Sequence, residues 1–257
     1  MPQSLEVHQF LCLSDNYGYL VHDPDSGNTA VIDTPEAAPI EAALREKGWT
    51  LTHILNTHHH GDHVGGNLEL KSSTGCSVVG PLADRDRIPG IDVALGDGDE
   101  FRLGDHRAVV YDTPGHTSGH ICYHFEDDEI AFVGDTLFAL GCGRLFEGTP
   151  AQMWDSLSKM LAWPDETAIY CGHEYTQANA RFALSVEPDN AALQARAAEI
   201  DRLRADGLPT IPTTMGLERA TNPFLRPDSV DLQKTIGLDG AGLLDVFTKT
   251  RALKDSY

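Results

Sequence analysis

The segment Thr57-His58-His59-His60-Gly61-Asp62-His63 directly follows the apolar run His53-Ile54-Leu55-Asn56, which predicts a short strand. In an extended chain the side chains alternate between two faces, so His58, His60 and Asp62 are expected on one side. His63 then follows in the next turn. Imidazoles and a carboxylate that converge at a strand end suit Zn²⁺, Fe²⁺ or Mn²⁺. A solvated polar loop is the alternative, but the pattern H-x-H-x-D-H after a predicted strand favours a metal site.

Three later segments share one form, in which a strand is followed by a glycine and then by a residue that can bind metal. They are Thr113-Pro114-Gly115-His116, Phe132-Val133-Gly134-Asp135 and Tyr170-Cys171-Gly172-His173. With the first motif they give seven candidate ligands: His58, His60, Asp62, His63, His116, Asp135 and His173. One ion with an open position needs only three or four ligands, so the set predicts two ions that share a carboxylate. Spacing does not decide which carboxylate bridges, and it leaves His59 and His120 as further candidates.

The order of the predicted elements indicates an α/β protein with a helical C-terminal part. Strands are expected at residues 7–13, 17–21, 29–33, 53–56, 77–80, 108–111, 121–125, 130–133 and 168–171. Helices are expected at 35–47, from Thr149 to Pro164, and at about 176–185 and 189–206. Thr149-Pro150-Ala151-Gln152 combines the spacing of a capping box with a proline at the first helical position. We expect a first domain over residues 1–170 and a smaller one over 171–257.

The charge and the cysteines limit the partners and the compartment. Nineteen Lys and Arg against 39 Asp and Glu give a net charge of −20, which argues against nucleic acid and anionic lipid as partners. The sequence contains no apolar run of roughly 18 residues and no basic, apolar leader at its start, so neither a membrane span nor export is expected. The five dispersed cysteines predict reduced thiols in the cytoplasm. We expect a monomer, because no exposed apolar stripe stands out.

The motifs of the chain follow one another in a characteristic order: H-x-H-x-D-H, then P-G-H-T-x-G-H, G-D-T-L-F and G-H-E-Y-T. In this order they resemble the metallo-β-lactamase superfamily. Three further segments are Asp15-Asn16-Tyr17, Gly141-Cys142-Gly143-Arg144 and Thr221-Asn222-Pro223-Phe224-Leu225-Arg226. With them the chain resembles, within that superfamily, the glyoxalase II, or hydroxyacylglutathione hydrolase, family.

The resemblance implies a fold and a metal centre. The fold is a four-layer αββα sandwich with a dinuclear metal site, followed by a mainly helical domain that binds glutathione. One ion is held by His58, His60 and His116, the other by Asp62, His63 and His173, and Asp135 bridges them. Asp62 and Asp135 are the catalytic carboxylates, and Asp62 is expected to orient the attacking hydroxide. Zinc is expected, with iron or manganese as alternatives that the same ligands accept.

The resemblance also implies a substrate, S-D-lactoylglutathione, whose thioester a metal-bound hydroxide hydrolyses to glutathione and D-lactate in methylglyoxal detoxification. A thiolate with a pKa of about 8.5 leaves readily, so no strong general acid is needed. The implied substrate-binding residues are Arg144, Phe146, Tyr175, Arg251 and Lys254. Two of them depart from the family, which often has lysine at position 144 and tyrosine at position 146. Without the resemblance, Arg251 and Lys254 read as the basic end of a helix.

Two other functions remain open at this stage. A persulfide dioxygenase of the same superfamily shares part of the metal motif but uses one iron. A non-catalytic metal-binding protein is the alternative from a different class, although such a protein is expected to have lost ligands.

Overall fold

The structure is a computed structural model that describes residues 4–257. It divides into two compact units. The first unit contains the described residues up to Asp112 together with Thr117–Gly134. The second contains Thr113–His116 and Asp135–Tyr257.

The first unit is built on a six-stranded sheet with the order β1-β2-β3-β4-β5-β6. Its strands are β1 (Glu6–Cys12), β2 (Asn16–His22), β3 (Thr29–Ile32), β4 (His53–Leu55), β5 (Ser77–Pro81) and β6 (Val93–Leu95). Strands β1 to β3 pair antiparallel, whereas β3 to β6 run parallel. The C-terminal ends of β3 and β4 therefore meet at one edge of the sheet, and the first histidine motif begins there.

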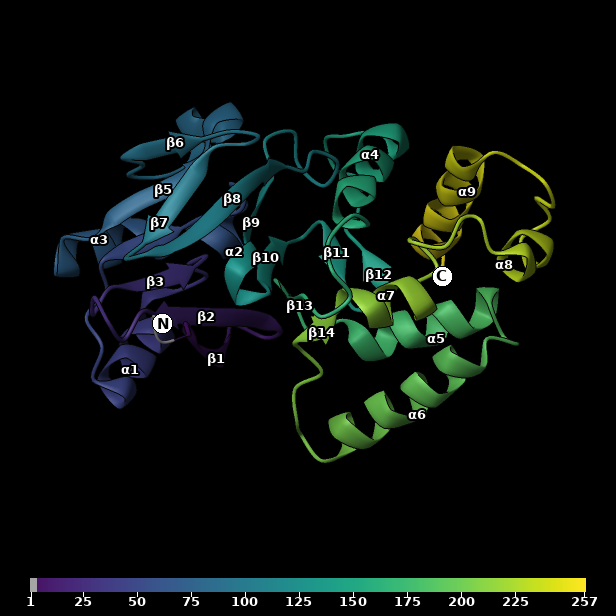
Figure 1. Ribbon diagram of the computed structural model, residues 1–257, viewed down its shortest axis with the longest axis horizontal. Helices are drawn as coiled ribbons and strands as arrows, with labels where there is room; N and C mark the ends of the chain where they lie inside the picture. Colours follow the sequence, from purple (N-terminus) through teal and green to yellow (C-terminus); the bar gives the residue numbers. More distant parts are fainter. Residues whose placement is uncertain (1–3) are drawn as a thin grey trace. The chain divides into compact units, whose positions relative to one another are not determined.

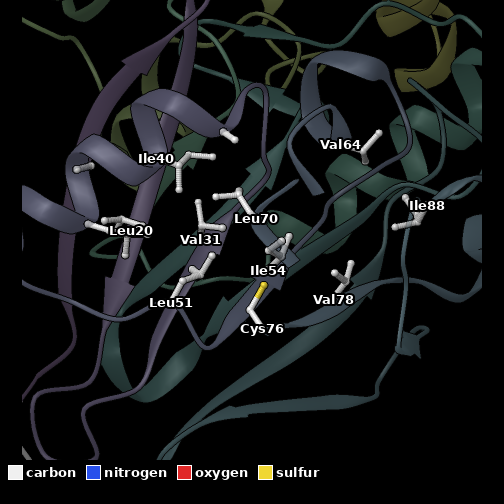
Figure 2. Close-up of a cluster of buried hydrophobic side chains, with 13 residues drawn as sticks. Leu20, Val31, Ile40, Leu51, Ile54, Val64, Leu70, Cys76, Val78 and Ile88 are labelled. Carbon is white, nitrogen blue, oxygen red and sulfur yellow. The ribbon is translucent and has the colours of Figure 1, made fainter. Parts of the chain in front are cut away.

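Helices cover one face of this sheet (Figure 1). They are α1 (Ala37–Lys47), the single turn α2 (Gly61–Val64) and α3 (Asn67–Thr74). Ile40 of α1 and Leu70 of α3 join Val31, Ile54 and other sheet residues in one buried apolar cluster, shown in Figure 2. Burial of this cluster fixes the sheet on its helix side, because the free energy gained scales with the apolar area removed from water.

An antiparallel ladder of four strands completes the first unit. It contains β7 (Glu100–Leu103), β8 (His106–Asp112), β9 (Ile121–Phe125) and β10 (Ile130–Gly134). The 3₁₀ turns η1 (Leu82–Arg87) and η2 (Glu126–Asp128) also belong to the first unit. Side chains of the two sheets interleave: the rings of Tyr19 and Phe132 lie 5.7 Å apart, and those of His53 and Phe101 lie 5.3 Å apart. A helical layer and two packed sheets result, which confirms the predicted α/β class.

The second unit is mainly helical. Its short strands are β11 (Leu137–Phe138), β12 (Gly141–Cys142), β13 (Ala168–Cys171) and β14 (Thr213–Thr214). Its helices are α4 (Pro150–Met160), α5 (Thr176–Val186), α6 (Ala191–Ala205), α7 (Met215–Thr221), α8 (Val230–Thr235) and α9 (Leu243–Asp255). Leu140 packs with residues of α5 and α6 in one buried cluster, and the rings of Trp154 and Phe247 join α4 to α9 at 5.7 Å.

Local sequence signals agree with these elements at most positions. The capping box at the start of α4 is present, with Thr149 accepting from Gln152 N and the Gln152 side chain accepting from Thr149 N. The expectation for Asp62 was wrong. Asp62 lies in α2 rather than in an extended segment, so its side chain does not follow the alternation of His58 and His60. Gly61 begins this helical turn directly after the loop that follows β4.

Two further observations concern the surroundings of the chain. No helix within residues 4–257 combines the length and the apolar character that a membrane crossing requires. All five cysteines are free thiols and buried.

Ile54 of β4 lies in the buried cluster of Figure 2, so its substitution should destabilise the strand that leads into the histidine motif. Ile54 is fully buried, so Ile54→Ala should lower the free energy of unfolding by about 2–5 kcal/mol by leaving a cavity. Ile54→Val removes one methylene and should cost about 0.5–1.5 kcal/mol. Urea unfolding followed by circular dichroism measures both, and equal losses in the two variants would contradict this packing.

Candidate metal centre

The first unit brings four of the seven predicted ligands together where β4 leads into α2. His58 Nε2 lies 3.1 Å from His60 Nδ1, and His63 Nε2 lies 3.5 Å from Asp62 Oδ2. The ring centroids of His58 and His63 are 4.0 Å apart. His58 and His63 are buried, and His60 and Asp62 are half-buried. The segment therefore presents imidazole nitrogens and a carboxylate in one small volume.

Asp33, which directly follows β3, orients this segment. Its carboxylate accepts hydrogen bonds of 2.8 Å from Thr57 N and from Thr57 Oγ1, and it lies 2.8 Å from His63 Nδ1. A histidine whose Nδ1 is engaged by a carboxylate presents Nε2 to a metal, with its ring fixed in direction. Asn16 acts on the other carboxylate, since its Nδ2 donates to Asp62 Oδ2 at 3.2 Å and to Asp62 O at 3.1 Å.

His59 and His120, which spacing alone left open, have other surroundings. His59 Nδ1 lies 2.9 Å from Asp84 Oδ2, and Arg87 lies 3.1 Å from His59 Nε2. Both ring nitrogens of His59 thus face charged side chains. The ring of His120 stacks on that of His58 at 4.9 Å, and a Cβ on Gly134 would lie 2.6 Å from His120 Nε2. Only glycine fits at position 134, where the φ of +46° also favours it.

The second unit brings the remaining three candidates together around one carboxylate oxygen. Asp135 Oδ2 lies 3.3 Å from His116 Nε2 and 3.4 Å from His173 Nε2. His116 Nδ1 lies 2.9 Å from the carbonyl oxygen of Arg144, which can only accept a hydrogen bond. The hydrogen of a neutral His116 ring is therefore on Nδ1, and its Nε2 faces Asp135.

This donor set fits divalent transition-metal ions. All seven side chains offer imidazole nitrogen or carboxylate oxygen, the donors that suit zinc, iron and manganese, whereas calcium sites are built from oxygen alone. Donor atoms of Asp33, His58 and His63 lie within 4.8 Å of one another. These buried clusters are consistent with a binuclear metal site.

Two of the predicted substrate-binding residues lie beside the histidines of the second unit. The ring of Tyr175 stacks on that of His173, with centroids 4.8 Å apart and planes 3° from parallel. The ring of Phe146 meets His116 edge-on at 5.2 Å. Both rings are exposed to solvent, Phe146 at 64% and Tyr175 at 39%. They can therefore contact a ligand that approaches His116 and His173.

The other three predicted residues belong to a group of cations in the second unit. Arg251 is buried, donates to Cys142 O at 2.9 Å and pairs with Asp255 at 2.8 Å. Lys254 donates to Ala178 O at 3.3 Å. Burial, together with the positive charges of Arg251, Arg181 and Arg144, lowers the pKa of Lys254 from 10.5 to about 8. We call Arg144, Arg181, Arg251 and Lys254 the cationic group; it is a local surplus of positive charge in a strongly acidic chain.

Comparison with known proteins identifies the family. Residues 15–173 match the metallo-β-lactamase superfamily, and residues 174–257 match the hydroxyacylglutathione hydrolase C-terminus. Over 253 residues the chain is 59% identical to the hydroxyacylglutathione hydrolase of Maricaulis maris and 57% identical to that of Methylococcus capsulatus. Each alignment covers 98% of this chain and 99% of the relative.

The chain belongs to the hydroxyacylglutathione hydrolase family. The predicted resemblance is confirmed, and so is the predicted fold, a metallo-β-lactamase fold followed by a helical C-terminal region. A solved structure, TTHA1623 in a di-iron-bound form, is similar with a TM-score of 0.59 and 26% identity, over 88% of this chain and all of that one.

Three residues that support the site of this family member were missed by the sequence analysis. Asp33 ends a predicted strand, and a carboxylate at that position beside a histidine motif is a signal that could have found it. Asn16 appeared in a family segment without a role. Arg181 lies on a predicted helix, and its part in the cationic group depends on packing that the sequence does not display.

The contacts of Asp33 predict a loss of metal affinity on its substitution. In Asp33→Asn one carboxylate oxygen becomes an amide group, which cannot accept from His63, so metal affinity should fall about 10–100-fold. Competition with a chromogenic chelator measures this. Asp84→Asn is the matched control, because Asp84 contacts His59, which is not among the seven predicted ligands, in the same way. An equal loss in both variants would refute the orienting role of Asp33.

Proposed function

We propose that this chain hydrolyses S-D-lactoylglutathione to glutathione and D-lactate. One observation carries the proposal: in a chain 59% identical to a hydroxyacylglutathione hydrolase, Asp135 Oδ2 lies within 3.4 Å of two ligand-type histidines. A carboxylate shared in this way is what two ions acting on one substrate require. The chain is then a metal-dependent thioester hydrolase, and the dioxygenase and non-catalytic alternatives become outcomes of the test below.

The ligand assignment that we propose follows the family. His58, His60 and His116 would hold one ion, Asp62, His63 and His173 would hold the other, and Asp135 would be the carboxylate that they share. Within each unit the distances support this division, because His58 pairs with His60, Asp62 pairs with His63, and Asp135 contacts both His116 and His173. We propose zinc as the metal, and iron or manganese as ions that the same donors accept.

The chemistry divides between the ions and the chain. When bound, two divalent ions supply a hydroxide nucleophile near neutral pH and polarise the carbonyl oxygen of a thioester. Asp62, held in place by Asn16, accepts a hydrogen bond from the nucleophile and directs it at the thioester carbon. The thiolate of glutathione has a pKa of about 8.5 and leaves without a strong general acid. A Ser-His-Asp triad is therefore unnecessary.

Glutathione is anionic, so it must be held against the field of a chain with a net charge of −20. We assign this task to Arg144, Arg251 and Lys254 of the cationic group. Tyr175 contacts the peptide part, and Phe146 supplies an apolar surface. The arginine at position 144 offers a two-pronged donor to a carboxylate, whereas the missing hydroxyl at position 146 removes one hydrogen bond worth about 0.5–1.5 kcal/mol.

We also propose the organisation and setting of the enzyme. The metal-binding domain that we propose spans residues 1–170 and the glutathione-binding domain spans residues 171–257. In this division His173 is a metal ligand from the second domain, and Arg144 and Phe146 are substrate contacts from the first. Five buried free thiols agree with a reducing compartment, the cytoplasm. The chain acts as a monomer.

Hydrolysis of S-D-lactoylglutathione by freshly purified protein, followed by loss of the thioester absorbance, tests the proposed function. We expect turnover that a chelator abolishes and that zinc, iron or manganese restores. Asp135→Ala should lose both metal and nearly all turnover, whereas Asp128→Ala, which removes the carboxylate partner of His106, should keep both. Absence of turnover in the metal-loaded protein would contradict the proposal and favour the alternatives.

The lowered pKa of Lys254 predicts a pH-dependent affinity. With a pKa of about 8, Lys254 is mostly charged at pH 7 and loses its charge as the pH rises through 8, so binding of an anion weakens there. The dissociation constant for S-methylglutathione should rise between pH 7 and 9. Lys254→Arg remains charged over this range and should flatten the profile. Parallel profiles for wild type and variant would remove Lys254 from the binding site.

A further inference from the structure

The hairpin of β11 and β12 adopts a conformation that its surroundings must enforce. Leu137 pairs with Cys142 and Phe138 with Gly141, which leaves Ala139 and Leu140 in the turn. Leu140 has a φ of +58°, in the left-handed region that non-glycine residues rarely adopt. Such a conformation persists only where neighbouring contacts over-determine it.

Four buried side chains hold the main chain of this hairpin at successive residues. Asn222 Nδ2 donates to Phe138 O at 3.1 Å and to Gly141 O at 3.0 Å, and Asn179 Nδ2 donates to Ala139 O at 3.1 Å. Glu218 accepts from Leu140 N at 2.9 Å, and Arg251 donates to Cys142 O at 2.9 Å. Gly141 is required by this approach, because a Cβ there would lie 2.5 Å from Asn179 Nδ2.

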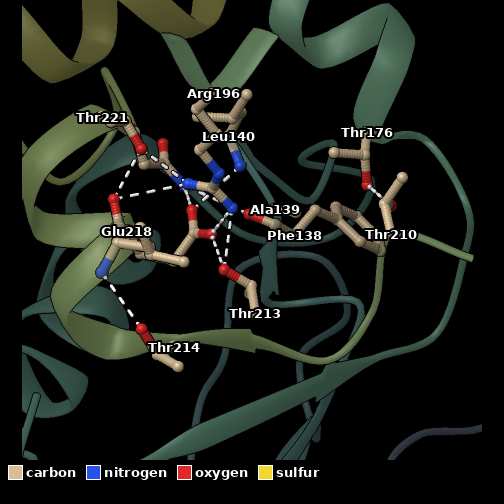
Figure 3. A network of polar contacts seen from close by, with 12 residues as sticks. Phe138, Ala139, Leu140, Thr176, Arg196, Thr210, Thr213, Thr214, Glu218 and Thr221 are labelled. Atoms are coloured by element: carbon tan, nitrogen blue, oxygen red, sulfur yellow. Dashed lines mark hydrogen bonds and ion pairs between the residues drawn. The ribbon is translucent and has the colours of Figure 1, made fainter. Parts of the chain in front are cut away.

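Glu218 is the centre of the network, which Figure 3 shows. It is fully buried, and both carboxylate oxygens are used. Oε2 accepts from Leu140 N and from Asn222 Nδ2, each at 2.9 Å. Oε1 pairs with Arg196 of α6 and accepts from Thr213 Oγ1 at 2.7 Å. Arg196 thus neutralises the carboxylate that fixes the hairpin.

The hairpin in turn supports residues assigned to the substrate. The ring of Phe138 lies 5.4 Å from Tyr175 and 6.1 Å from the ligand His173. Cys142 is followed after one glycine by Arg144, which belongs to the cationic group and whose carbonyl oxygen holds His116. A shift of the hairpin therefore displaces both the ring of Phe138, which contacts Tyr175, and the segment that leads to Arg144.

We propose that Glu218, with its counterion Arg196, is a positioning residue for substrate binding. It acts through the hairpin Leu137–Cys142 and touches neither substrate nor metal. The proposal rests on the proposed function. It assigns a role to the buried ion pair between α6 and α7, whose carboxylate accepts from Leu140 N directly before the segment Gly141-Cys142-Gly143-Arg144.

Glu218→Gln tests the proposal. An amide has only one accepting oxygen, so its NH₂ group must face either Leu140 N and Asn222 or Arg196 and Thr213, and donors then face donors. We expect the KM for S-D-lactoylglutathione to rise about tenfold, the change that follows from losing about 1.4 kcal/mol of binding. The kcat and the bound metal should change much less than the KM, because no metal ligand and no group that acts on the thioester is removed.

Glu187→Gln is the matched control. Glu187 is an equally buried carboxylate of the second unit, but its partners are Arg226 and Ser229 instead of the hairpin. This variant should lose stability like Glu218→Gln yet keep the wild-type KM. Equal KM values in the two variants, or a fall in kcat and metal content with unchanged KM in Glu218→Gln, would overturn the proposal.

Further variants separate positioning from folding. Arg196→Met removes the cation beside Glu218 and should raise the KM. Arg196→Lys keeps a cation there, so most of this rise should be absent. If Glu218→Gln does not fold, Asn222→Ser removes the bonds to Phe138 O and Gly141 O and should raise KM in the same way. No rescue by Arg196→Lys, or a wild-type KM in Asn222→Ser, would count against the proposal.

Two readouts do not depend on turnover. Hydrogen exchange of the Leu140 amide should be faster in Glu218→Gln than in Glu187→Gln, and the affinity for S-methylglutathione should be lower. If the wild type does not hydrolyse the thioester, the proposed function fails, while these two readouts still decide the positioning role. Identical exchange and affinity in the two variants would refute it.

Discussion

The carboxylate of Asp33 is the constraint on which the first half of the metal centre depends. It follows β3, and it holds Thr57, which follows β4, and His63 in α2. Because β3 and β4 run parallel, their carboxyl ends meet at one edge of the sheet, where ligand sites of α/β proteins commonly form. Asp33 itself adopts a φ of +55°, a conformation that its three acceptor contacts help to maintain. The sheet brings these segments together, and the carboxylate of Asp33 orients the ring of His63.

The second unit also orients a candidate metal ligand, but it does so with different groups. A backbone carbonyl, Arg144 O, orients His116, and the segment that contains this carbonyl follows a hairpin held by buried amides, a carboxylate and a guanidinium. Buried polar groups are tolerated only when they are hydrogen-bonded, so each of these side chains both needs and fixes its partner. The polar interior of this unit is therefore a rigid support, because a displaced hairpin would leave several buried groups unsatisfied at once.

The sequence predicted those features of the fold and of the site that depend on local patterns. The seven ligand candidates each follow a predicted strand, and the start of α4 is defined within four residues, so both could be found without tertiary information. Asp62 was wrongly expected in an extended segment, because the single helical turn that begins at Gly61 is too short to show a helical periodicity in the sequence. The hydrogen bond from Leu140 N to Glu218 joins residues 78 positions apart, and no local pattern marks a buried carboxylate that accepts from so distant a backbone amide. Family resemblance pointed to Gly141-Cys142-Gly143-Arg144 but gave no reason for its glycines, which the contact with Asn179 provides for Gly141.

The net charge of the chain and the charge of the cationic group have opposite signs. A net charge of −20 repels an anionic substrate at long range, but at the ionic strength of a cell this repulsion decays over about 8 Å. Within that distance the cationic group dominates. Burial, and after it the positive charges of Arg251, Arg181 and Arg144, lowers the pKa of Lys254. A carboxylate bound among these cations, as we propose for glutathione, would reduce the repulsion between them. Arg251 belongs to the same group, and its guanidinium donors hold Cys142 O and the carboxylate of Asp255.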